Sequence, residues 1–92
     1  MEARRYIVRG RVQGVGFRWF VEFEARQLGL AGWVRNTAEG TVEVLAMGTE
    51  QQLAALRQRL YKGPRAARVD EVQETPAALI PGLTTFGIEG AW

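Results

Sequence analysis

The chain has 92 residues, a formal net charge of +2 and 24% charged residues, a composition that is typical of a globular protein with one modest core. It contains no histidine, serine or cysteine, which excludes a Ser-His-Asp or Cys-His catalytic site, a histidine or thiolate metal site and disulfide bonds. Because it shows neither an apolar run long enough to span a membrane nor an export signal, we expect a single cytoplasmic domain over residues 1–92.

The first part of the chain predicts a strand, a loop and a helix. Residues 4–12 alternate between a face of apolar and small side chains and a face rich in arginine, which is the pattern of a half-buried strand. Apolar residues then recur at helical spacing over residues 17–28, and Gly29 is a typical helix end. A strand that leads through a short loop into an amphipathic helix is therefore expected.

Two further strands and a tight turn follow this helix. Residues 30–36 predict a strand that ends in Asn36, with Asn36 on the same face as Gly32 and Val34. Residues 37–40 read as a hairpin turn closed by a glycine. The next predicted strand covers residues 41–47, and its inward face holds Val42, Val44 and Ala46.

A second helix has clear signals at both ends. Thr49 and Gln52 have the spacing of a capping box, in which the side chain of each residue bonds the backbone of the other. Gly63 and the proline after it are expected to end this helix. The buried stripe of the helix is predicted to contain Leu53, Leu56 and Leu60.

The last part of the chain predicts two strands separated by a loop. Residues 67–74 read as a strand, and strict alternation places Val69 and Val72 on opposite faces. The stretch Thr75–Thr85 contains two prolines and a glycine, so we expect a loop there. Residues 86–89 predict a short last strand.

This order of elements predicts an α+β protein of the ferredoxin-like βαββαβ kind, with a short extra C-terminal strand. In such a sandwich two helices cover one face of an antiparallel sheet. We expect the face of the second strand that bears Asn36 to be the covered one. A polar amide at such a position needs a hydrogen-bonding partner or a ligand.

The stretch from Val12 to Arg18, Val-Gln-Gly-Val-Gly-Phe-Arg, joins the first strand to the first helix. Its two glycines allow the backbone to curl with positive φ, and a curled loop at a helix start directs several main-chain N–H groups at one point. Arg18 adds a full positive charge on a planar set of donors. The stretch predicts a small anion site, most simply for a phosphate, although a tight turn followed by a solvated arginine fits the same residues.

Two runs of residues, in the right order and at the right spacing, resemble the signatures of the acylphosphatase family. The matching residues are 8–18, 32–36, Gly40, Val42 and Gly48. The resemblance covers residues 6–72. It departs from the family pattern at Trp19 and Phe23, which are bulkier than expected at those positions.

The resemblance implies an enzyme that hydrolyses the carboxyl–phosphate bond of a small acyl phosphate, with a carboxylate and inorganic phosphate as products. It implies that Arg18 holds the phosphoryl group and that Asn36 orients the attacking water, without a metal or an organic cofactor. The main-chain N–H groups that cradle the phosphate are implied at Gln13, Gly14, Val15, Gly16 and Phe17. We expect a monomer with no nucleic-acid or membrane partner.

Less specific interpretations of the same residues exist. Arg18 has Glu22 one helical turn further on, so an ion pair on the helix surface is an alternative role. Asn36 precedes a hairpin, where asparagine often serves the turn itself. Ferredoxin-like sheets also bind RNA through paired aromatic residues, but Ile7 and Arg9 stand at the positions where such aromatics are expected. A relative without catalytic activity is a further alternative, which the presence of both Arg18 and Asn36 disfavours.

Overall fold

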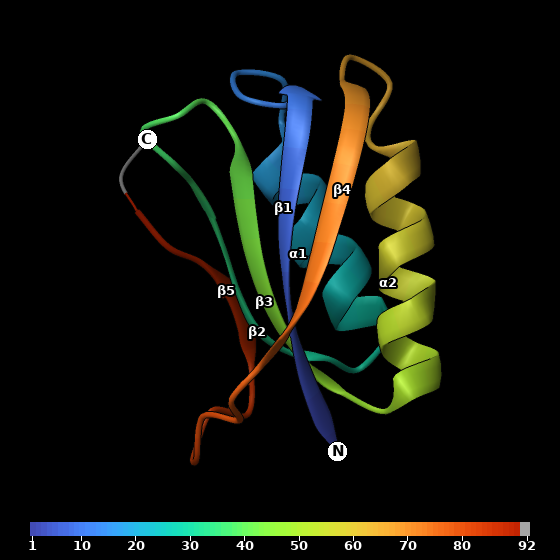
Figure 1. Ribbon diagram of the computed structural model, residues 1–92, viewed down its shortest axis with the longest axis vertical. Helices are drawn as coiled ribbons and strands as arrows, with labels where there is room; N and C mark the ends of the chain where they lie inside the picture. The colour runs from blue at the N-terminus through green and yellow to red at the C-terminus, as the bar shows by residue number, and fades with distance from the viewer. Residues whose placement is uncertain (91–92) are drawn as a thin grey trace.

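The computed structural model describes residues 1–90, which form a five-stranded sheet with two helices on one face (Figure 1). The elements are β1 (Glu2–Arg11), α1 (Phe17–Gln27), β2 (Ala31–Asn36), β3 (Val42–Gly48), α2 (Glu50–Lys62), β4 (Arg68–Ala77) and β5 (Phe86–Ile88). In the sheet the strands lie in the order β4-β1-β3-β2-β5. The predicted α+β class and ferredoxin-like order of elements are confirmed.

Strand pairing brings the ends of the three central strands together at one end of the sheet. β3 lies between β1 and β2 and runs antiparallel to both, so Val42 at its start is opposite Val8 on one side and Asn36 on the other. β4 is antiparallel to β1, whereas β5 pairs with β2 in parallel, which makes the complete sheet mixed. Consequently the carboxyl ends of β1 and β2 both lie beside the start of β3.

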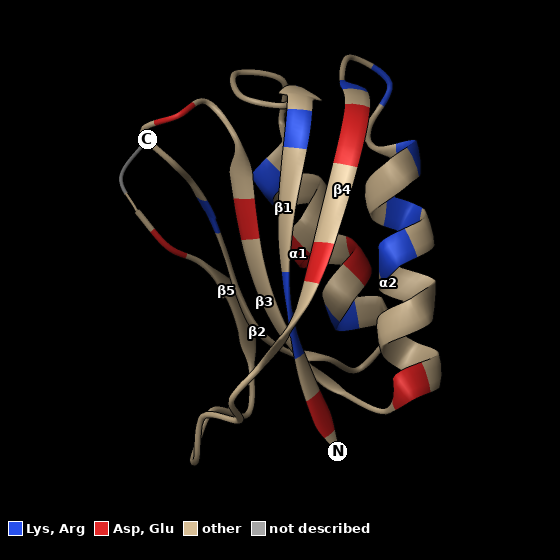
Figure 2. Cartoon of the chain, in the orientation of Figure 1, with Lys and Arg blue, Asp and Glu red and all other residues tan. Residues whose placement is uncertain are grey.

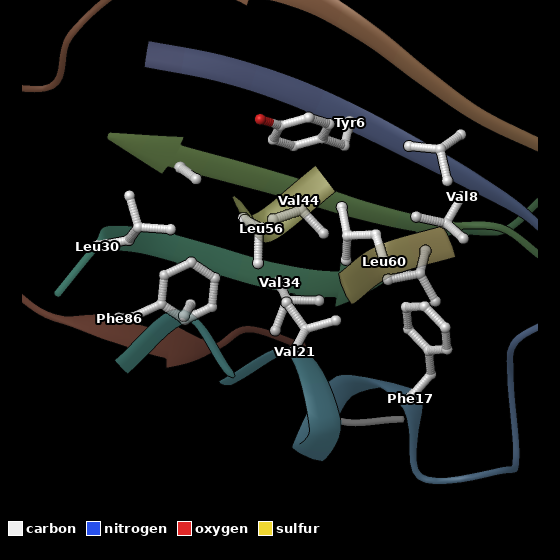
Figure 3. Close-up of a cluster of buried hydrophobic side chains, with 14 of the residues drawn as sticks. Tyr6, Val8, Phe17, Val21, Leu30, Val34, Val44, Leu56, Leu60 and Phe86 are labelled. Carbon is white, nitrogen blue, oxygen red and sulfur yellow. The ribbon is translucent and has the colours of Figure 1, made fainter. Parts of the chain in front are cut away.

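The core fills the space between the sheet and the helices (Figure 3). Tyr6 and Val8 on β1, which share the predicted inward face, are fully buried there. The hydroxyl of Tyr6 donates a hydrogen bond to the main-chain oxygen of Leu53, 3.2 Å away, so its polar atom has a partner within the core. The predicted stripe of α2 is buried, and so are Phe17, Val21 and Ala25 of α1. Burial of these faces fixes both helices against the sheet.

The capping box at the start of α2 is present as expected. The main-chain N–H of Gln52 donates to the hydroxyl oxygen of Thr49 at 3.1 Å, and the N–H of Thr49 donates to the side-chain oxygen of Gln52 at 2.8 Å. At the other end Gly63 is the C-cap, as predicted. Within residues 1–90, neither helix is long and apolar enough to cross a membrane.

Two expectations for the last part of the chain are wrong. β4 continues to Ala77, so the loop begins after that residue and not at Thr75, because the long first strand provides pairing partners as far as Ala3. Pro76 is tolerated there since β4 is an edge strand. The register of β1 and β4 also shifts, which places both Val69 and Val72 against the core instead of on opposite faces.

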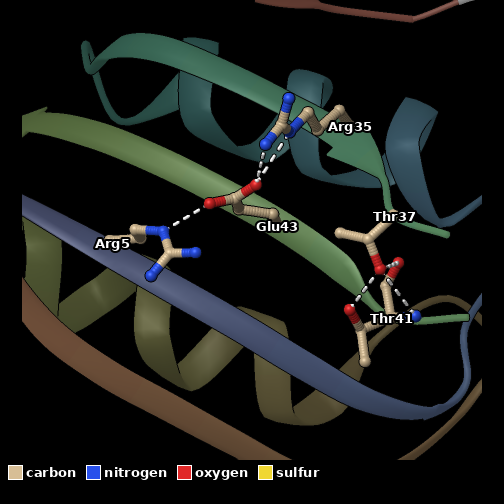
Figure 4. Close-up of polar contacts among 5 residues, drawn as sticks. All are labelled: Arg5, Arg35, Thr37, Thr41 and Glu43. Carbon is tan, nitrogen blue, oxygen red and sulfur yellow. Dashed lines mark hydrogen bonds and ion pairs between the residues drawn. The ribbon is translucent and has the colours of Figure 1, made fainter. Parts of the chain in front are cut away.

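The open face of the sheet carries paired charges. Figure 2 shows basic residues of β1 beside acidic residues of β3 and β4. Glu43 of β3 is only 4% exposed, and its carboxylate accepts hydrogen bonds from Arg5 on one side and from Arg35, at 2.7 Å, on the other (Figure 4). Burial raises the pKa of Glu43, but the two guanidinium donors outweigh it and hold the pKa below its ordinary value.

Candidate active site

The loop between β1 and α1 curls in the way that its two glycines permit. Gly14 and Gly16 have φ values of 73° and 77°, in the left-handed region that glycine adopts without strain. A Cβ atom at either position would meet nothing within 4 Å. These glycines are therefore required for the backbone conformation and not for space, and the room beside them stays open.

The start of α1 carries positive charge from its main-chain N–H groups and from Arg18. Gly16 is the N-cap, so no side chain accepts a hydrogen bond from the first helical N–H groups, and no acidic residue lies in the first turn. Main-chain N–H groups at a helix start carry partial positive charge. Arg18, in that first turn, adds a full charge. An anion placed here would meet donors that no capping side chain occupies.

A small cavity brings the two expected catalytic residues together. It holds about 130 Å³ and is lined by Val12, Gly14, Gly16, Phe17, Arg18, Trp19 and Asn36. Asn36, 8% exposed, reaches it from the end of β2, and Arg18 reaches it from α1. Gly14 and Gly16 of the loop also line it. The cavity therefore combines a guanidinium, a buried amide and a curled backbone.

The alternative ion pair of Arg18 is not formed. Glu22 bonds Arg26 instead, with 3.2 Å between the nitrogen and the oxygen. In the described part of the chain, residues 1–90, no carboxylate lies within ion-pair distance of Arg18. No ion pair in residues 1–90 therefore compensates the charge of Arg18 at the cavity.

Gln13 and Val15 do not line the cavity, unlike the other three loop residues expected to bind phosphate. Gly14, Gly16 and Phe17 line the cavity, whereas Val15 packs partly buried against the core. The side-chain amide of Gln13 donates to two main-chain oxygens of the β2–β3 turn, Thr37 O and Thr41 O, each at 2.9 Å. This amide ties the loop to the turn that follows Asn36.

Two threonines, Thr37 and Thr41, hold the hairpin turn. The N–H of Thr37 donates to the main-chain oxygen of Thr41 at 3.0 Å, and their hydroxyls share a hydrogen bond of 2.6 Å (Figure 4). Asn36 itself lines the cavity. Neither the threonine pair nor the tie from Gln13 was predicted from the sequence. The only sequence signal for the threonine pair was that a residue with a hydrogen-bonding side chain stands at each end of the turn.

Together these features define a class of protein: a small α+β domain in which a curled loop, a helix start and an arginine meet at one cavity. A family model described as acylphosphatase matches residues 4–88. The chain therefore belongs to the acylphosphatase family, a family of hydrolases, as its two signature runs implied.

Individual relatives agree with this assignment. The chain is 64% identical over 91 residues to an acylphosphatase of Koribacter versatilis (strain Ellin345), covering 99% of this chain and 83% of the relative. It is 46% identical over 88 residues to an acylphosphatase of Pasteurella multocida (strain Pm70), covering 96% and 98% of the two chains. Its structure is similar to the crystal structure of acylphosphatase from Bacillus subtilis, with a TM-score of 0.93, 41% identity, and coverage of 98% of this chain and 100% of that chain. The expectation of a hydrolase is confirmed.

Proposed function

We propose that the chain hydrolyses the carboxyl–phosphate bond of small acyl phosphates, and that the 130 Å³ cavity is where the phosphoryl group binds. The observation that carries this proposal is the meeting of Arg18 and Asn36 at one cavity, from elements that are far apart in the sequence. An acyl phosphate suits a site without histidine, because its carboxylate is already a good leaving group. Such a substrate needs positioning and charge stabilisation more than a strong general acid.

Arg18 and the loop hold the phosphoryl group in this mechanism. The guanidinium of Arg18 binds two phosphoryl oxygens at once, which a lysine could not do with the same geometry. Main-chain N–H groups of residues 13–17 and of the helix start donate to the same oxygens. In phosphoryl transfer, charge spreads over these equatorial oxygens in the transition state, so these donors lower the barrier as well as bind the substrate.

Asn36 orients the attacking water. Its side-chain oxygen accepts a hydrogen bond from the water, and its amino group donates to an oxygen, but an amide cannot act as a base. The water oxygen forms a bond to phosphorus, and the bond from phosphorus to the acyl oxygen breaks with its electron pair on the carboxylate. The proton of the water passes to a phosphoryl oxygen of the substrate. The products are a carboxylate and inorganic phosphate, and no step uses a metal or an organic cofactor.

We further infer the setting in which this reaction takes place. The chain acts as a single domain over residues 1–92, as a monomer in the cytoplasm, with no nucleic-acid or membrane partner. Arg5 and Arg35 share Glu43, and Arg9 pairs with Glu71, so much of the positive charge on the open face of the sheet is compensated, which supports the absence of a nucleic-acid partner.

Hydrolysis of acetyl phosphate in the presence of a chelator tests the proposal. We expect Arg18→Ala to lower kcat/KM by about 10³-fold or more, and Asn36→Ala to lower kcat by about 10²–10³-fold. Arg18→Lys keeps the charge but loses the paired donors, so we expect only partial recovery. Arg65→Ala, at an exposed position outside the cavity, is the matched control and is expected to retain wild-type rates.

The outcomes separate the parts of the proposal. Loss of turnover on chelation contradicts the metal-free mechanism. Turnover that survives Arg18→Ala shows that the phosphoryl group binds elsewhere. A bell-shaped rate profile with an essential enzyme group titrating near pH 7 contradicts proton transfer to the substrate. Circular dichroism of each variant distinguishes a lost catalytic contact from a lost fold.

A further inference from the structure

Trp19 and Phe23 are large aromatic residues on α1 to which the proposed mechanism gives no role. They are 69% and 62% exposed. Residues four apart lie on the same face of a helix, so the two side chains project from the same face of α1. Exposed apolar residues that gather in this way mark binding surfaces, whereas single exposed apolar residues are ordinary.

Trp19 also lines the cavity that contains Arg18 and Asn36. It is thus both a wall of the proposed phosphoryl site and part of the outer surface. The cavity holds about 130 Å³, whereas sites that enclose a drug-sized organic ligand measure roughly 300–1,000 Å³. The phosphoryl end of a substrate fits inside, and a larger acyl group has to lie outside, at the rim that Trp19 forms.

The charges along α1 are compatible with an apolar group at this rim. Glu22 is paired with Arg26 at 3.2 Å, and Glu24 is paired with Arg59 of α2 at 2.8 Å. The acidic side chains of this helix are therefore compensated, and they do not place a net negative charge against an anionic substrate. The rim offers aromatic surface next to the positive charge of Arg18.

We infer that Trp19 is the wall that binds the acyl group, that Phe23 extends this wall, and that the site prefers acyl phosphates with aromatic or extended apolar acyl groups. The inference rests on the proposed hydrolysis of acyl phosphates. A planar acyl group stacks on the indole ring and removes apolar area from water. Acetyl phosphate has a single methyl group to offer, so it gains little from the same surface.

Kinetics on benzoyl phosphate and acetyl phosphate test this assignment. The measured quantity is the ratio of kcat/KM for benzoyl phosphate to kcat/KM for acetyl phosphate. We expect Trp19→Ala to lower this ratio about tenfold, mainly by raising KM for benzoyl phosphate. Trp19→Phe keeps a stacking surface and is expected to restore most of the ratio. Tyr61→Ala removes an aromatic residue that is 46% exposed on α2, and as the matched control it leaves the ratio unchanged.

Each contrary result has its own meaning. If Trp19→Ala leaves the ratio unchanged, whether the two kcat/KM values stay the same or fall by the same factor, the role of Trp19 is refuted. Acyl phosphate hydrolysis is not affected by that result. The unchanged ratio is what a surface for another protein would give. A folded wild type that hydrolyses neither substrate refutes the inference and the proposed function together. Unfolding midpoints measured for every variant establish that the ratios come from folded protein.

Discussion

The tie from Gln13 to the β2–β3 turn provides a sharp test of how the site is positioned. The side-chain nitrogen of Gln13 donates to Thr37 O and Thr41 O, each at 2.9 Å. These two bonds join the loop that we propose cradles the phosphoryl group to the turn that follows Asn36. Replacement of Gln13 therefore disturbs the alignment of two halves of the site without removing either Arg18 or Asn36.

The stability cost of Gln13→Ala can be worked out from the partners that remain. Thr37 O still accepts from the N–H of Gly40 at 3.2 Å, and Thr41 O still accepts from the N–H of Thr37 at 3.0 Å. Neither oxygen is left without a donor, so the loss is limited to two ordinary hydrogen bonds. At 0.5–1.5 kcal/mol each, we expect the free energy of unfolding to fall by about 1–3 kcal/mol.

Gln13→Glu keeps the shape of the side chain and replaces the attraction to the two carbonyl oxygens by repulsion. A carboxylate oxygen facing two carbonyl oxygens is repelled, so the free energy of unfolding at pH 7 is expected to fall further than in Gln13→Ala. The protonated carboxyl can donate to one of the carbonyls, which raises its pKa in the folded state. A carboxyl group whose pKa is higher in the folded than in the unfolded protein does not lower the free energy of unfolding at pH values below its unfolded pKa. Its destabilising effect grows as the pH rises through its folded pKa.

Urea unfolding at pH 4.5 and pH 7.5, with wild type at each pH as the reference, measures these effects. We expect the difference between Gln13→Glu and wild type to be larger at pH 7.5. In parallel, kcat/KM for acetyl phosphate is expected to fall about 10–100-fold in Gln13→Ala, because a displacement near 1 Å is enough for such a loss. Equal stability of all three proteins at both pH values, with unchanged kinetics, would refute the positioning role.

Two further predictions concern the sheet. Gly32→Ala places a Cβ atom against a main-chain carbonyl oxygen of β3, at a residue whose φ is 145°. We expect urea unfolding to show that the free energy of unfolding falls by about 3 kcal/mol or more. Gly87→Ala, where a Cβ atom would meet nothing within 4 Å, is the mild control. Glu43→Gln weakens the bonds from Arg5 and Arg35 and is expected to cost about 1.5–3 kcal/mol at pH 7. Because the pKa of Glu43 is lowered, its contribution is present above the unfolded pKa and lost as the pH falls through the folded value, so the same measurement at pH 3 should show a smaller difference.

Local patterns were sufficient to predict most of the fold. Alternation defined β1, β2 and β3, helical spacing defined α1 and α2, and the capping box located the start of α2. Strict alternation failed in β4, because the register shift opposite Arg9 and Gly10 is a property of the pair of strands and not of one strand alone. The end of β4 was missed for a related reason: proline ends most strands, but it is tolerated where only one neighbour requires hydrogen bonds.

Part of the candidate site could be predicted from the sequence, and the rest required the fold. The glycines and Arg18 lie within one short run, so local chemistry alone was enough to propose that they form an anion cradle. Asn36 reaches the same cavity only because β3 separates β1 from β2 and is antiparallel to both, with Val42 opposite both Val8 and Asn36. Two strand spacings, roughly 10 Å, then separate the end of β1 from the end of β2. The loop after β1 bridges that distance through the side-chain amide of Gln13, which bonds the turn that follows β2.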